Sequence, residues 1–87
     1  MRNRTTKKNM TDALAALNAQ LGVKEGEEDS FCLQGAYGGW QLCRHWKGDI
    51  SIGGFKSKRE VYEMIHNITY GVLLAKRRMN GIAYYTN

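Results

Sequence analysis

The sequence lacks the features that mark membrane proteins, secreted disulfide-rich proteins and redox enzymes. No apolar run approaches the roughly 20 residues that a membrane-spanning helix needs. No apolar stretch follows the basic N-terminal residues, so we expect no secretory signal. Only two cysteines occur, Cys32 and Cys43, and they form no Cys-x-x-Cys pair, which argues against a disulfide framework, a redox motif and a zinc knuckle. These absences favour a cytoplasmic protein.

What is present fits one small globular domain. The chain has 87 residues, of which 43% are hydrophobic, so general disorder is not expected. A domain of this size buries only roughly 60–65% of the surface that its unfolded chain exposes, so its margin of stability is thin. No internal repeat or low-complexity segment divides it.

The charge is positive and clustered. Thirteen Lys and Arg residues against eight Asp and Glu residues leave a net charge of +5, which favours polyanionic partners. A solvated surface and a true anion site both remain open as interpretations. The basic groups are the N-terminal Arg2, Arg4, Lys7 and Lys8; a central Lys56, Lys58 and Arg59; and Lys76, Arg77 and Arg78. One acidic loop comprises Glu25, Glu27, Glu28 and Asp29.

The first helix is expected to begin near Thr11, a suitable N-cap. Residues 1–9 show no hydrophobic periodicity and are predicted to form a disordered basic arm, with the folded domain at 10–87. A stripe at helical spacing follows, and Gly22 with Val23 marks the C-terminal stop. The stripe consists of Met10, Leu14, Leu17 and Leu21.

From Ser30 to Gly53 the pattern alternates, as in strands. A two-residue turn at Gly38-Gly39 would place Tyr37 opposite Trp40 and Phe31 opposite Trp46. One face would then hold Phe31, Leu33, Tyr37, Trp40, Leu42 and Trp46, and the other Cys32, Gln34, Ala36, Gln41, Cys43 and His45.

The second turn has two readings. A two-residue Lys47-Gly48 turn would direct Ile50 and Ile52 to the polar face. A three-residue connection, Lys47 to Asp49, would direct both to the apolar face, and consistency of the core favours it.

The second helix has a clear start, because Ser57 and Glu60 match the capping box. We expect Gly71 to allow close packing, the helix to end near Met79, and the tail with Tyr84 and Tyr85 to fold back or serve as a contact. Its core-facing stripe is Val61, Met64, Ile65, Ile68, Val72 and Ala75. The predicted fold is therefore α+β: a three-stranded antiparallel meander in the order α-β-β-β-α, with both helices on the aromatic face.

Catalysis and metal binding are weakly indicated. Cys32 and His45 would share the open face, but nothing in the sequence orients the histidine as a base. Cys32, Cys43 and His45 would form three zinc-type ligands, yet the fourth is missing because His66 lies on a helix of the opposite face. We therefore expect no enzyme, metal or cofactor.

Binding is better indicated. The start of a helix favours a phosphate, and Lys56, Lys58 and Arg59 strengthen this. Tyr37, Trp40 and Trp46 could stack on bases, although aromatics more often fill a core; Tyr37 and Trp40, near the turn, are expected to stay partly exposed. The expected partner-binding residues are Lys56, Lys58, Arg59, Tyr37, Trp40, Lys76, Arg77 and Arg78.

Two resemblances follow from these motifs. The α-β-β-β-α order, with Gly54-Phe-Lys-Ser-Lys-Arg59 opening the last helix, resembles a double-stranded RNA-binding domain. That family contacts phosphates at this helix start, which implies such a role for Lys58 and Arg59 with Lys56 in support. The chain departs from the family in lacking a Gly-Pro-x-His segment between the first two strands.

Residues 31–75 also look like small phage and prophage proteins of unassigned function. The likeness is carried by Ala36-Tyr-Gly-Gly-Trp40 and Lys58-Arg-Glu-Val-Tyr62, and it implies a β-meander followed by a helix, with no catalytic residues. The resemblance also implies a phage accessory protein that acts by binding in the host cell.

Three hypotheses result. The first is a module that contacts nucleic acid or a nucleoprotein through the basic start of the last helix. The second is an anti-CRISPR-like inhibitor that binds a host defence enzyme through the polar sheet face or the Tyr84-Tyr85 tail. The third, a homodimeric structural protein, follows if an apolar face is left uncovered.

Overall fold

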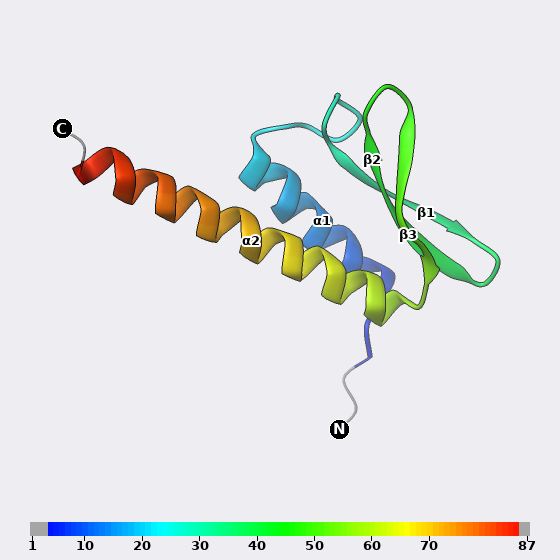
Figure 1. Ribbon diagram of the computed structural model, residues 1–87. Coiled ribbons are helices and arrows are strands. Elements are labelled where there is room, and N and C mark those ends of the chain that lie inside the picture. The colour runs from blue at the N-terminus through cyan, green and yellow to red at the C-terminus, as the bar shows by residue number, and fades with distance from the viewer. Residues whose placement is uncertain (1–3, 86–87) are drawn as a thin grey trace.

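The protein folds as an α-β-β-β-α domain, as the sequence predicts (Figure 1). The computed structural model describes the backbone of residues 4–85 and the side chains of residues 4–79. The three strands form one antiparallel sheet in the order β1-β2-β3. Both helices begin at the same end of the molecule (Figure 1). The elements are α1 (Lys7–Leu21), β1 (Phe31–Ala36), β2 (Gly39–His45), β3 (Asp49–Lys56) and α2 (Lys58–Tyr85).

Helix α1 begins earlier than predicted. Thr6, not Thr11, is the N-cap: its hydroxyl accepts from the Asn9 amide at 3.1 Å, and the Asn9 side chain accepts from the Thr6 amide at 2.8 Å. This reciprocal pair satisfies two amides that a helix start leaves free. Thr11 instead donates its hydroxyl to the Lys8 carbonyl inside the helix. The predicted disordered arm of residues 1–9 therefore includes three residues of α1, and residues 1–3 lie outside the part that is described.

The C-terminus of α1 is as predicted. Gly22 adopts a left-handed conformation with a φ of 73° and closes the helix with its amide. Asn18, one turn earlier, is buried and makes two hydrogen bonds to the backbone of Phe31 at the start of β1. The end of α1 is thereby joined to the edge of the sheet.

The first hairpin turns one residue earlier than predicted. Tyr37 and Gly38 occupy the turn with φ values of 53° and 72°, and Ala36 pairs with Gly39. A Cβ at Gly39 would lie 2.9 Å from the Lys56 carbonyl oxygen, so this glycine is needed for the close approach of β3. The pairing shifts by two residues, which keeps the side chains of the paired strand residues on their predicted faces. Tyr37 and Trp46 lie in turns outside the pairing, so Phe31 pairs with Arg44 and not with Trp46.

The second hairpin has the predicted three-residue connection, placed one residue earlier, at residues 46–48. His45 pairs with Asp49, so Asp49 is the first residue of β3 and not part of the turn. Ile50 pairs with Arg44 and Ile52 with Leu42. Both isoleucines therefore share the apolar face, as the sequence predicts.

Strand β3 is irregular where it approaches α2. The pairing shifts between Leu42–Ile52 and Trp40–Lys56, and Gly53 and Gly54 between them have φ values of 81° and 74°. Such backbone angles favour glycine, so this pair permits the bulge that turns the chain toward Ser57.

The core lies between the two helices and the aromatic face of the sheet, as predicted. Leu33, Trp40 and Ile52 pack against it while partly exposed. Helix α1 packs over β1 and α2 over β2, and the two helices pack on each other. The buried cluster is Met10, Leu14, Leu17, Phe31, Leu42, Val61 and Ile65.

Helix α2 is longer than predicted. It passes Met79 and Gly81 without interruption and reaches Tyr85, so residues 80–85 form no folded-back tail. The prediction of close packing at Gly71 is also wrong, because a Cβ there would meet no atom within 4 Å. The second half of α2 extends beyond α1 (Figure 1). The side chains of Tyr84 and Tyr85 lie outside the described residues, so their predicted contact stays a prediction.

Candidate functional site

One open groove lies where the two helices begin beside the first hairpin turn. It is formed by the N-cap of α1, the N-cap of α2 and the glycine of the turn. These come from three separate stretches of the sequence, which the fold brings together. The lining residues are Arg4, Thr5, Thr6, Gly38, Ser57, Lys58 and Arg59. Two helix N-termini at one groove combine two positive dipole ends, which favours an anion there.

The start of α2 is capped as predicted. The Ser57 hydroxyl accepts from the Glu60 amide at 3.2 Å, and the Glu60 carboxylate accepts from the Ser57 amide at 3.2 Å. Hydrogen bonds from the Ser57 amide and hydroxyl hold the pKa of Glu60 below its usual value. The capping pair satisfies these two amides, whereas those of Lys58 and Arg59 in the first turn have no carbonyl one turn earlier to pair with.

Two of the three predicted cations point into solvent at this groove. Lys58 and Arg59 are exposed, and Arg59 lies 3.8 Å from Glu63 in an exposed ion pair of little strength. Lys56 is half-buried at the end of β3. Arg4 joins them from the chain before α1. In the sequence Arg4 belongs to the N-terminal basic group, and only the packing of α1 on α2 brings it to this groove.

The aromatic residues divide between surface and core. Tyr37 is 92% exposed and packs edge-on against Phe55, with ring centroids 5.2 Å apart. Trp40 packs against the core, and the Lys7 ammonium group lies 5.5 Å from its ring centroid. Phe55 was not predicted as a site residue, because the bulge at Gly53 and Gly54 decides its direction. An exposed aromatic pair therefore stands beside the basic groove.

The third basic cluster lies elsewhere. At about 1.5 Å per residue, Lys76 is roughly 27 Å along α2 from Lys58, so the two clusters do not form one surface. Lys76 donates to the Gln20 side chain at 3.4 Å, while Arg77 and Arg78 are exposed. Of the predicted binding residues, the structure therefore separates Lys76, Arg77 and Arg78 from the rest.

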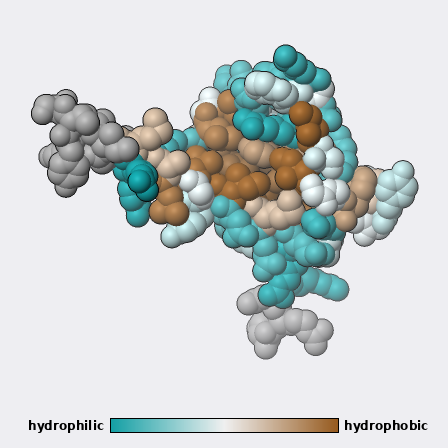
Figure 2. Space-filling view, in the orientation of Figure 1, coloured by the Kyte–Doolittle hydropathy of each residue, from teal (hydrophilic) through white to brown (hydrophobic). Residues whose placement is uncertain are grey.

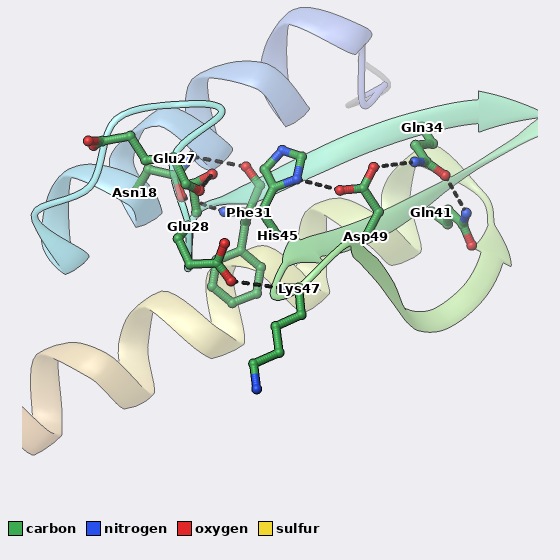
Figure 3. Close-up of polar contacts among 10 residues, drawn as sticks. Asn18, Glu27, Glu28, Phe31, Gln34, Gln41, His45, Lys47 and Asp49 are labelled. Atoms are coloured by element: carbon green, nitrogen blue, oxygen red, sulfur yellow. Dashed lines mark hydrogen bonds and ion pairs between the residues drawn. The ribbon is translucent and has the colours of Figure 1, made fainter.

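The open face of the sheet carries a connected polar chain (Figure 3). His45 pairs with Asp49 through Nδ1, and Asp49 accepts from the Gln34 amide at 3.3 Å. Gln41 in turn donates to Gln34 at 2.7 Å and accepts from the Ser51 hydroxyl at 2.6 Å.

Both cysteines are free and lie opposite each other on this face. Burial, followed by the nearby Cys43 and Asp49, raises the pKa of Cys32 to about 11. Burial also raises the pKa of Cys43. A thiol with a raised pKa stays protonated at neutral pH, which is the reverse of the low pKa that activates a catalytic cysteine.

The fold defines the class of protein: a small α+β domain with a three-stranded meander, two helices on one face and a basic groove at their shared end. No protein-family model, curated protein or solved structure matches this chain. Within residues 4–85, no helix combines the length and apolar character that crossing a membrane requires.

Proposed function

We propose that this protein is a nucleic-acid-binding module that holds backbone phosphates in the groove between the first turns of α1 and α2. Lys58, Arg59 and Arg4 contact the phosphates, with Lys56 in support, and Tyr37 stacks on a base beside them. In keeping with the resemblance of residues 31–75, we assign it the role of a phage-type accessory factor.

One observation carries the proposal: two helix N-termini and three cationic side chains share a single groove. Helix ends and Arg or Lys side chains are standard phosphate ligands. Tyr37, at 92% exposure, contributes little to the core, and its ring is available to stack on a base without rearrangement of the fold.

The test is a fluorescence-anisotropy titration against labelled single-stranded and double-stranded DNA and RNA at several salt concentrations. With about three phosphates neutralised, log affinity should fall with log salt with a slope of roughly −2 to −3. Changing Lys56, Lys58 and Arg59 together to Ala should weaken binding and flatten this slope.

The chain offers a matched control in Lys76, Arg77 and Arg78. Changing these three to Ala removes the same charge at a distance from the groove. If both triple variants bind equally weakly, net charge alone drives the association and the site assignment is wrong. If the wild type binds none of the four nucleic acids, the proposal fails and an inhibitor that binds a host protein takes its place.

A second property, self-association, is favoured by an apolar strip that the helices leave uncovered. Trp46 and Ile50 are 47% and 48% exposed, and with Arg44 and Ile52 they line a shallow hollow. Figure 2 shows apolar residues gathered between the helices and the sheet on this face. A sheet surface of this kind needs a helix to cover it.

The middle and later part of α2 carries a second exposed apolar surface. It exposes four large apolar side chains, and the basic cluster Lys76, Arg77 and Arg78 lies before the last of them; these side chains are Tyr70, Leu73, Leu74 and Met79. The acidic loop lies beside the sheet strip, since Asp29 pairs with Arg44 at 3.4 Å and Glu28 accepts from the Lys47 amide at 2.8 Å (Figure 3). We propose that α2 of a second copy covers this strip, with Lys76, Arg77 and Arg78 facing the acidic loop.

A further inference from the structure

Three side chains of metal-ligand type meet on the open face of the sheet. The Cys32 thiol, the His45 imidazole and the Asp49 carboxylate offer ligand atoms that all lie within 4.8 Å of one another. Each side chain comes from a different strand, β1, β2 and β3 in turn. None of the three lines the basic groove, and all three lie on the face of the sheet that the helices do not cover.

The register of the second hairpin assembles this cluster. His45 pairs directly with Asp49, and Cys32 lies on the same face of the adjoining strand. Had Asp49 belonged to the turn, its carboxylate would have left this face. The sequence predicted a set of Cys32, Cys43 and His45 with no fourth ligand, because His66 lies on a helix of the opposite face; the structure brings Asp49 to Cys32 and His45.

Polar neighbours hold Asp49 in place, as the surroundings of metal ligands commonly do. One carboxylate oxygen pairs with His45 Nδ1, and the other accepts from Gln34 Nε2 at 3.3 Å. Gln34 is itself fixed by Gln41 at 2.7 Å (Figure 3). An oxygen of Asp49 is therefore kept pointing toward the histidine and the thiol.

We propose that Cys32, His45 and Asp49 bind a zinc-type divalent transition metal ion. One sulfur, one nitrogen and one oxygen ligand suit Zn²⁺, which prefers tetrahedral sites of such donors. The Cys43 thiol lies directly opposite Cys32 in the sheet and is the candidate for the fourth position.

The metal would tie together the three strands on the face that has no helix. An 87-residue domain gains from such a link, because small domains often need a metal or a disulfide to supplement a modest core. The folded sheet holds the three ligands in one arrangement, which the unfolded chain does not have. Zinc would therefore bind the folded protein more tightly and should raise its melting temperature.

The experiment is a competition titration of the chelator-treated full chain with Zn²⁺ against a chromophoric chelator. We expect one Zn²⁺ per chain, and tetrahedral d–d bands with a thiolate charge-transfer band when Co²⁺ is used instead. Cys32→Ser and Asp49→Asn should each weaken Zn²⁺ binding by more than about tenfold. The matched control is His66→Ala, which removes an exposed imidazole of α2 that lies outside both the ligand cluster and its hydrogen-bonded chain.

Circular dichroism without metal separates loss of binding from loss of folding. If Cys32→Ser fails to fold, Asp49→Asn still tests the site, because Asn keeps the size of the side chain and removes the anionic ligand. The proposal is overturned if the wild type binds no stoichiometric Zn²⁺, or if Asp49→Asn binds it as tightly as the wild type and the control variant do. The nucleic-acid titration uses different residues, so failure of one proposal leaves the other standing.

Discussion

The side chain of Asn18 pairs with the backbone of Phe31 as a neighbouring strand would. Its amide nitrogen donates to the Phe31 carbonyl at 3.1 Å, and its oxygen accepts from the Phe31 amide at 2.8 Å. Phe31 lies on edge strand β1, whose outward backbone groups would otherwise have no partner in a buried position. One polar side chain thus joins α1 to the sheet and closes part of its edge.

Asn18→Ala should destabilise the protein strongly. Each buried backbone group left without a partner costs about 1–3 kcal/mol, and this change leaves two. Gln20→Ala on the same helix is the control, and it should change the free energy of unfolding by no more than about 0.5 kcal/mol. Urea denaturation followed by circular dichroism measures both, and equal effects would contradict the role given to Asn18.

Gly54→Ala should destabilise the bulge in β3. At a φ of 74°, a side chain costs about 1–2 kcal/mol, although no atom lies within 4 Å of the added Cβ. Gly71→Ala is the matched control, since Gly71 also has open space around it but lies within α2. There, alanine should stabilise by about 0.5–1 kcal/mol. The same sign for both variants in denaturation would disprove the strain argument.

The capping box of α2 predicts a pH dependence of stability. The pKa of Glu60 is lowered in the folded protein from the ordinary 4.5. Its contribution to stability is therefore fully present above pH 4.5 and is lost as pH falls through the lowered value. Glu60→Gln keeps the acceptor but removes the charge, so its stability should differ most from that of the wild type above pH 4.5 and converge at lower pH. A constant difference across the pH range would show that Glu60 acts by shape alone.

Tyr37→Ala should weaken binding of single-stranded nucleic acid by about 1–3 kcal/mol, the usual contribution of one stacked base. The salt dependence should stay unchanged, because no charge is removed. Tyr37→Phe is the conservative control and should bind as the wild type does. Anisotropy titration at two salt concentrations distinguishes these outcomes, and loss of binding in both variants would point to the hydroxyl group and not to stacking.

Self-association should depend on the uncovered strip and on charge. Ile50→Glu and Leu74→Glu should each shift the protein from dimer to monomer in sedimentation equilibrium, because each adds a charge to an apolar contact. Raised salt should weaken the dimer by screening the basic cluster of α2 from the acidic loop. Ala16→Glu adds the same single charge at an exposed position of α1, outside both surfaces, and should leave the dimer intact. A wild type that stays monomeric at high concentration would exclude the second-copy proposal.

Local sequence signals determined the order of the elements and the composition of their faces. Ser57 with Glu60 and Gly22 marked helix ends because the capping atoms lie within a few residues of one another. Alternation along the strands placed Phe31 and Leu42 in the core, because side chains on successive strand residues point to opposite faces. The same patterns located Lys58 and Arg59 at the start of α2.

Tertiary structure decided what local patterns leave open. The first turn lies one residue earlier than predicted, which places Gly39 in β2 where a Cβ would lie too close to the Lys56 carbonyl oxygen. The second turn also lies one residue earlier, which places Asp49 beside His45. The packing of α1 on α2 brought Arg4 to Lys58 and Arg59, while the length of α2 carried Lys76 away from them. Contacts between residues distant in the chain depend on register and on helix packing. For that reason the sequence by itself determined which residues are basic, apolar or metal-binding in type, and only the folded chain decided which of them meet.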